Sequence, residues 1–106
     1  MPPPEDSVLL RIFTGENHHY QRLPLFEAIV LKAREAHLAG ATVLHGILGF
    51  GKSSRLHHSS PLILSSDLPV VVEIVDRADK IEAFLPILDQ MMSSGLVTME
   101  KAHVVK

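Results

Sequence analysis

Two amphipathic helix patterns, each set between runs of strand-forming residues, constrain the fold of this chain more than any other feature. Residues 23–39 and 77–92 repeat apolar side chains every three or four positions, which predicts a helix in each stretch. Four stretches rich in Val, Leu, Ile and Phe flank these helices and predict strands at residues 8–14, 41–50, 68–75 and 96–105. The predicted order of elements is therefore β-α-β-β-α-β.

This order predicts an α+β domain with the ferredoxin-like fold, in which four strands form one antiparallel sheet and both helices cover one face. The strand LPVVVEIV at 68–75 is apolar on both sides, so we expect the other sheet face to be covered as well. Because a chain of 106 residues forms one small domain, a neighbouring subunit is the expected cover. We expect that single domain over residues 8–106, after a disordered, proline-rich lead at residues 1–7.

Proline, glycine and aspartate set the expected limits of the two helices. Pro24 suits the first turn of the first helix, and Gly40 suits its C-terminal end. Asp76 is a suitable N-cap for the second helix. Pro86 lies inside that helix, where it removes one hydrogen bond and should cause a kink.

The composition argues against several classes of function. A formal net charge of -2 argues against a general nucleic-acid binder. The absence of cysteine excludes disulfides and thiolate zinc sites. No apolar run reaches the roughly 18 residues that a membrane span needs, and the sequence MPPPEDS lacks the order of a signal peptide. We therefore expect a cytoplasmic protein that neither inserts in a membrane nor binds nucleic acid.

Residues 46–53, GILGFGKS, match the P-loop pattern of nucleotide triphosphatases letter by letter. A working P-loop requires a strand, a wide loop and then a helix whose N-terminus faces the phosphates. Here residues 46–49 belong to the predicted strand, and the segment SRLHHSSP that follows Ser53 has no helical period. Asp76, which could pass for the second motif of such enzymes, is better explained as a helix cap. The context therefore argues against a P-loop enzyme.

The segment 51–61, GKSSRLHHSSP, is a long, basic, hydroxyl-rich loop between two strands that a two-residue turn could join. Loops of this length in small domains are commonly functional, and paired glycines can direct successive N–H groups toward one anion. The residues that we expect to bind such a ligand are Arg11, Gly15, Gly49, Gly51, Lys52, Ser53, Ser54 and Arg55. A turn with solvated charges explains the same residues equally well.

Five segments that span nearly the whole chain resemble, in the same order, the DUF190 family. They are LRIFTGE at 10–16, PLFEAIVLKARE at 24–35, AGATVLHGILGFGKSSRLH at 39–57, LPVVVEIVD at 68–76 and IEAFLPILDQM at 81–91. The third segment carries the most specific part of the resemblance.

The resemblance implies a function, because members of this family are similar to the trimeric PII signalling proteins. It implies a homotrimer with a central core of sheets, an adenine nucleotide or other small anion as effector, and no catalytic activity. Residues 51–61 take the position of the T-loop, through which PII proteins control transporters or enzymes, so a membrane transporter or channel is the expected partner. One departure matters: the Gly-rich basic segment that holds phosphates in PII proteins is reduced here to SSG at 93–95.

Seven histidines keep a second hypothesis open, a small metal-binding protein or hydrolase. His18–His19 and His57–His58 are adjacent pairs, which point to opposite sides of a strand and so form no ready chelate. A site that combines one pair with the other across the fold remains an alternative, although we predict no metal ligand and no cofactor. A loop is also a poor support for a catalytic serine, histidine and acid. A third hypothesis is a purely structural trimer subunit.

Overall fold

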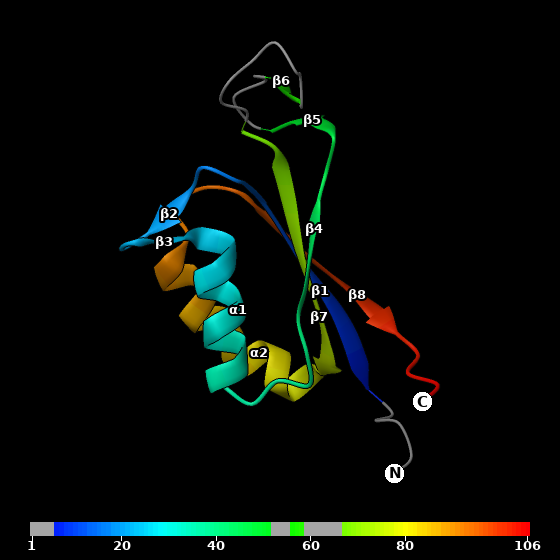
Figure 1. The fold of residues 1–106 in the computed structure, drawn as a ribbon. Coiled ribbons are helices and arrows are strands. Elements are labelled where there is room, and N and C mark those ends of the chain that lie inside the picture. Colours follow the sequence, from blue (N-terminus) through cyan, green and yellow to red (C-terminus); the bar gives the residue numbers. More distant parts are fainter. Residues whose placement is uncertain (1–5, 52–55, 59–66) are drawn as a thin grey trace.

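The structure, a computed structural model, describes residues 6–51, 56–58 and 67–106. It contains one four-stranded antiparallel sheet with the strand order β4-β7-β1-β8, and two helices that lie on the same side of that sheet (Figure 1). The elements are β1 (Ser7–Gly15), α1 (Leu25–Glu35), β4 (Thr42–His45), β7 (Pro69–Arg77), α2 (Ala78–Met91) and β8 (Leu96–Ala102). The predicted ferredoxin-like fold is confirmed.

Two short hairpins add to this framework. The first joins β2 (His19–Tyr20) to β3 (Leu23–Pro24), and the second joins β5 (Leu48–Phe50) to β6 (Leu56–His58). The first hairpin was not predicted from the sequence, because residues 15–22 have the pattern of a polar connection. Pro24 consequently ends β3 and caps α1, rather than lying in the first turn of the helix.

The hydrophobic core lies between the sheet and the helices. Alternate residues of β1 and β7 point toward the helices, among them Leu10, Ile12, Val72 and Ile74, and all four are fully buried. The helices add their apolar stripes, which include Ile29, Ala33, Ile81, Phe84 and Leu88. Because the core is aliphatic apart from Phe84, it depends on close packing of branched side chains.

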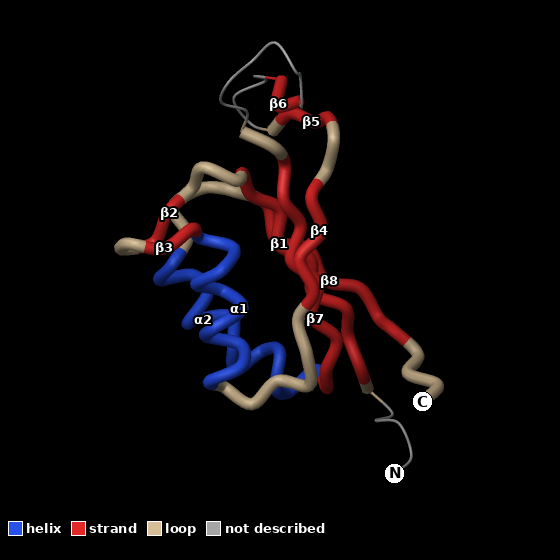
Figure 2. The backbone as a smooth tube through the Cα atoms, viewed as in Figure 1, coloured by secondary structure: helices blue, strands red, loops and turns tan. Residues whose placement is uncertain are grey.

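The opposite side of the sheet, here called the open face, is covered by no element that the structure describes (Figure 2). Strand alternation places Arg11 and Phe13 of β1 on this face. The cross-strand register then aligns one apolar row across all four strands, in the order Leu44, Val71, Phe13 and Leu96. Leu44 and Leu96 are 48% and 59% exposed.

Helix α1 ends at Glu35, four residues before the predicted limit at Ala39. Its last carbonyls are satisfied by two reversed bonds, from the Leu38 amide to the Ala33 carbonyl and from the His37 amide to the Arg34 carbonyl. This pattern requires a left-handed residue directly after the C-cap, and His37 takes that role with a φ of 60°. A histidine where glycine is usual explains why the sequence pointed to Gly40 instead.

Asp76 is not the N-cap of α2, as the sequence predicted. It lies within β7, and Arg77 is the N-cap residue, without any side-chain capping bond. The Asp76 carboxylate is buried and accepts hydrogen bonds from the backbone amides of Ala39, at 2.9 Å, and of Arg77, at 2.7 Å. It therefore ties the connection after α1 to the junction between β7 and α2. Helix α2 continues past Pro86 to Met91.

The predicted strand 41–50 is interrupted. β4 ends at His45, and β5 starts at Leu48 and pairs with β6 instead of β7. The cause lies in the partner strand: Pro69 at the start of β7 has no N–H group with which to continue the ladder. The last strand is also shorter than the predicted range 96–105. β8 ends at Ala102, opposite Ser7, the first residue of β1.

Candidate functional site

The β5–β6 hairpin, here called the arm, stands beyond the end of the four-stranded sheet (Figure 1). Its register pairs Gly49 with His57. The side chains of Ile47, Leu48 and Phe50 are 82%, 63% and 67% exposed. Three neighbouring large apolar side chains that the chain itself leaves in solvent are typical of a contact surface.

Pro69 fixes the base of the arm against two glycines. The Gly46 amide donates a hydrogen bond to the Pro69 carbonyl oxygen at 2.7 Å. A Cβ atom at Gly46 would lie 2.8 Å from the Cγ atom of Pro69, and one at Gly49 would lie 3.3 Å from the same atom. Gly46, the first glycine of the P-loop-like pattern, and Gly49, at a position that the pattern leaves free, therefore make room for a proline ring and not for a phosphate.

The end of β1 is held to the segment that leaves the arm. The Asn17 amide donates to Oδ1 of Asp67 at 2.9 Å, and the Glu16 amide donates to the Leu68 carbonyl at 2.8 Å. A Cβ atom at Gly15 would lie 2.8 Å from Oδ1 of Asp67, so a side chain there would displace this carboxylate. The turn after β1 and the arm base therefore form one connected unit.

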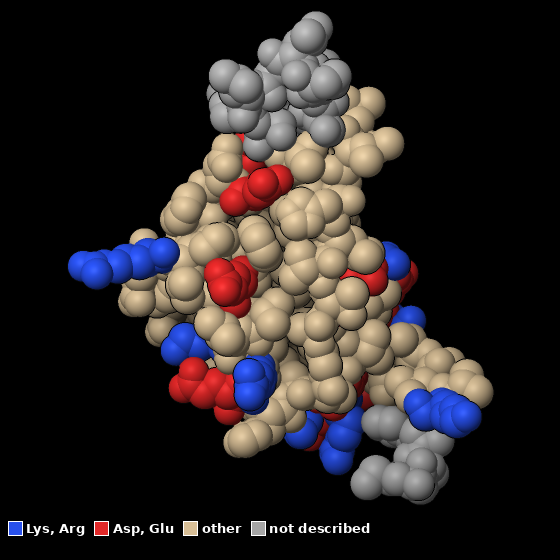
Figure 3. Space-filling model, viewed as in Figure 1, with Lys and Arg blue, Asp and Glu red and all other residues tan. Residues whose placement is uncertain are grey.

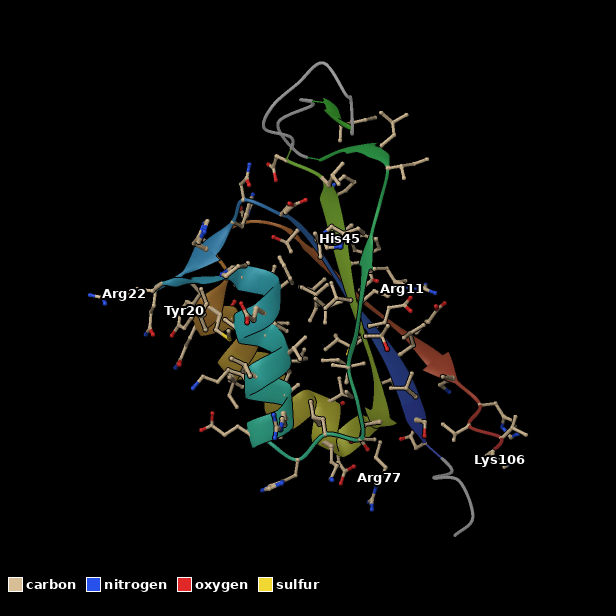
Figure 4. The ribbon with its side chains drawn as sticks, viewed as in Figure 1. Arg11, Tyr20, Arg22, His45, Arg77 and Lys106 are labelled. Carbon is tan, nitrogen blue, oxygen red and sulfur yellow. The ribbon has the colours of Figure 1, made fainter. Side chains whose placement is uncertain are left out.

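His45 and Glu16 meet on the helix side of the arm base, and sequence reasoning had not brought them together. Nε2 of His45 lies 3.7 Å from Oε2 of Glu16, and the ring of Phe26 packs edge-on against the imidazole with a centroid separation of 5.7 Å. Figure 4 shows His45 between the strands and the helices. The pairing of His45 with Glu16 depends on the residue at which β4 ends, and no local sequence pattern predicts that residue.

Arg11 does not lie at the arm base. It points to the open face (Figure 4), where Nε donates to Glu73 at 2.9 Å and Nη1 donates to Glu100 at 2.7 Å. The hydrogen bond to Glu73 raises the pKa of Arg11 above its ordinary value, and the charge of Glu100 adds to this rise. Arg11 is thus a charged cross-strand clamp between β7 and β8.

The remaining predicted ligand residues divide between described and undescribed segments. Gly51 is exposed, and nothing lies within 4 Å of a Cβ atom built there. Lys52, Ser53, Ser54 and Arg55 lie outside the described residues. Near the arm, the visible face in Figure 3 carries acidic rather than basic side chains, and Glu16 and Asp67 belong to the arm base. Positive charge for an anion would therefore have to come from Lys52 and Arg55.

The histidines form no metal centre among the residues that the structure describes, where no three metal-ligating side chains converge. The Nδ1 atom of His19 lies 2.8 Å from the Asn17 carbonyl oxygen, which holds this ring against its own turn. The side chains of His57 and His58 fall outside the description. Neither described helix is both long and apolar enough to cross a membrane.

Comparison with known families identifies the chain. The family model DUF190, described as "Uncharacterized ACR, COG1993", matches residues 7–104. The chain belongs to the DUF190 family. Two UPF0166 proteins of Aquifex aeolicus (strain VF5) are similar to this DUF190 chain: one is 39% identical over 97 residues, covering 92% of the chain and 91% of the relative. The other is 33% identical over 98 residues, covering 92% and 96%.

Two solved structures share the fold of this DUF190 chain. The divalent ion tolerance protein CutA1 from Ehrlichia chaffeensis matches with a TM-score of 0.66 and 10% identity, over 95% of the chain and 85% of CutA1. CPII, a nitrogen regulatory PII-like protein from Thiomonas intermedia K12 bound to ADP, AMP and bicarbonate, matches with a TM-score of 0.62 and 17% identity, over 92% and 87%. The family and the PII-like fold implied by the sequence are thus confirmed.

The connection between α2 and β8 is a tight turn in this DUF190 protein. Gly95 has a φ of 119°, and a Cβ atom there would lie 2.8 Å from the Phe13 carbonyl oxygen. Only glycine suits both the conformation and the close approach. The three-residue connection SSG at 93–95 therefore packs closely against β1 at Gly95.

Proposed function

We propose that this protein is a non-enzymatic, PII-like regulatory protein that senses a small anion or an adenine nucleotide through residues 51–61. The observation that carries the proposal is the arm itself. It leaves the sheet between β4 and β7, the position that the family resemblance assigns to the T-loop, and it exposes Ile47, Leu48 and Phe50. CPII, which shares the fold, is described with ADP, AMP and bicarbonate bound.

The proposed ligand contacts combine backbone and side-chain donors. Lys52 and Arg55 neutralise the anion, and the amides near Gly49 and Gly51 together with the hydroxyls of Ser53 and Ser54 donate hydrogen bonds to it. Glu16 and Asp67 at the arm base repel an anion. Binding of an anion therefore requires the positive charges of both Lys52 and Arg55.

Ligand binding would act as a population shift of the arm. Pro69, pressed against Gly46 and Gly49, is a fixed pivot. A ligand held by residues 51–55 would favour one arrangement of the hairpin and so present its apolar side chains to a partner, for which we propose a membrane transporter or channel. The partner contact gains affinity from burial of three side chains that are otherwise in water.

We further propose that the protein is a homotrimer in which the open face is buried. The apolar row that begins at Leu44 and ends at Leu96 crosses all four strands and has no cover among the described residues. Arg11 lies on the same face, in the row of residues next to this apolar row, and forms ion pairs with both Glu73 and Glu100. Because Arg11 bonds to both carboxylates and offsets one of their two charges, burial of this face leaves these three groups together with a single net negative charge and not as separate ions.

Isothermal titration with ATP, ADP, AMP and bicarbonate tests the ligand proposal. We expect at least one of these to bind the purified protein, and the double variant Lys52→Ala/Arg55→Ala to bind about tenfold or more weakly. Arg34→Ala is the matched control, because Arg34 is an exposed cation at the far end of α1 and should leave binding unchanged.

Two results would contradict the ligand proposal: no heat with any of the four compounds, or equal weakening by the Arg34 control. Binding of Zn²⁺ that survives the double variant but is lost in His57→Ala/His58→Ala would favour the metal-binding hypothesis. Unchanged behaviour after deletion of residues 52–55, including partner control in cells, would favour a purely structural subunit.

A further inference from the structure

A groove on the outer side of α1, next to the β2–β3 hairpin, has no role in the function proposed above. Its cavity volume is about 420 Å³, and it is lined by residues 20–23 of the hairpin and by Ala28, Leu31, Lys32 and Glu35 of α1. None of these residues belongs to the arm or the open face. The groove is therefore a separate feature of the surface.

The groove lies beside the core-facing side of α1. Leu25, Ala28, Ile29 and Ala33 are the buried residues of this helix. Positions 28, 31, 32 and 35 follow a spacing of three and four residues, so the groove runs from the edge of the core at Ala28 to the exposed Lys32 and Glu35. Leu23 and Leu31, which also line it, remain 37% and 44% exposed.

The rim of the groove carries positive charge. Arg22 extends from the hairpin away from the body of the molecule (Figure 4), and within the described parts of the chain it makes no ion pair. Lys32 makes only a loose pair with Glu35, 3.8 Å away, in which both side chains are well exposed. Two cations are thus available above an apolar floor.

The backbone of the hairpin turn is left-handed at Gln21. Gln21 has a φ of 57°, a conformation that residues with a side chain rarely adopt. Tyr20 pairs with Leu23 on either side of this turn, so Gln21 and Arg22 form the two-residue turn of the hairpin, where a positive φ is usual.

We propose that this groove binds an acidic amphipathic helix of a partner protein. An apolar side chain of that helix rests on Ala28 between Leu23 and Leu31, and flanking carboxylates face Arg22 and Lys32. The stripe from Ala28 to Glu35 is about 10 Å long, which matches two turns of a partner helix. The groove is only partly enclosed, which suits a helix laid across it better than a small molecule that has to be surrounded. This inference holds whether or not the arm senses an anion.

Binding of designed peptides to the full-length protein tests the proposal. The probes are helical peptides of about 16 residues with Leu or Phe spaced as i, i+3, i+4 and i+7 and with Glu on the flanks, together with matched peptides in which Lys replaces Glu. We expect the acidic set to bind with a dissociation constant below about 100 μM by fluorescence anisotropy, and the basic set to bind about tenfold more weakly. Amide chemical shifts should change at residues 20–23 and 28–35.

Two variants test the assigned contacts. Arg22→Glu reverses an exposed rim charge and should weaken the acidic peptides about tenfold, while Leu31→Asn should weaken both sets. Arg34→Glu, on the same helix but outside the groove, should have a smaller effect than Arg22→Glu. The proposal is overturned if no peptide binds at about 1 mM, if shifts map elsewhere, or if Arg34→Glu matches Arg22→Glu. It is also overturned if Leu31→Asn dissociates the native assembly, since a second copy would then be the occupant.

Discussion

The ring of Pro69 occupies the space beside Gly46 that a Cβ atom would need, and its carbonyl oxygen accepts the Gly46 amide at 2.7 Å. This contact explains the glycine at the first position of the P-loop-like string. A proline packs on Gly46 and Gly49, and the strand β5, not a helix, contains Gly49. Packing therefore accounts for Gly46, whereas nothing lies within 4 Å of a Cβ atom at Gly51, the second glycine that the pattern requires.

The first prediction follows from this contact. Gly46→Ala should destabilise the protein by about 1–3 kcal/mol, because the added methyl group overlaps the Pro69 ring unless the arm shifts. Gly40→Ala is the matched control: nothing lies within 4 Å of its Cβ position, and it should be neutral or stabilising by up to about 1 kcal/mol. Urea unfolding at fixed protein concentration measures both, and equal stability of the two variants would contradict the contact.

The second prediction concerns Asp76 as a bridge between two backbone segments. Asp76→Ala leaves the Ala39 amide, which donates a part-buried hydrogen bond, without its acceptor and should cost about 1–3 kcal/mol. Asp76→Asn keeps one acceptor oxygen and should cost less. Asp79→Ala, which removes an exposed partner of Arg77, should change stability by no more than about 1 kcal/mol. A loss in Asp79→Ala as large as in Asp76→Ala would show that negative charge near the start of α2, and not the hydrogen bond to Ala39, accounts for the effect.

The sequence predicted the order of elements along the chain and both helices, because these depend on repeated apolar spacing over many residues. The end residues of individual helices and strands were predicted less accurately. Asp76 is in the right position for a cap, but its carboxylate bonds to the distant Ala39 amide, and a contact across 37 residues leaves no local pattern. The pairing of His45 with Glu16 was missed for the same reason.

The third prediction tests the end of α1. His37→Gly should stabilise the protein by about 1 kcal/mol, because His37 adopts a left-handed conformation that glycine takes without steric cost. The hydrogen bond from Lys80 to the His37 carbonyl is retained in this variant. His37→Ala should give no such gain, since alanine keeps the Cβ atom. Thermal unfolding of the two variants at equal concentration distinguishes them, and equal melting temperatures would contradict the assignment.

The fourth prediction concerns a polar atom without a partner. The hydroxyl oxygen of Thr14 is buried and makes no hydrogen bond within the described parts of the chain, although most such atoms in proteins are satisfied. Thr14→Val keeps the shape and removes the hydroxyl, so it should raise the free energy of unfolding by about 1 kcal/mol. Ser94→Ala, which removes an exposed hydroxyl between α2 and β8, should leave stability nearly unchanged. A destabilised Thr14→Val protein would show that the hydroxyl has a partner in solution.

The fifth prediction tests burial of the open face by subunit association. Phe13 lies in the middle of the apolar row, between Val71 and Leu96. Phe13→Asp places a charge there and should convert the protein from a trimer to a monomer of 11.7 kDa in sedimentation equilibrium, because an unpaired carboxylate is too costly to bury. Leu31→Asp is the control, since Leu31 is similarly exposed but lies on α1, on the other side of the molecule. A monomeric wild-type protein, or dissociation by Leu31→Asp alone, would show that the open face does not hold the subunits together.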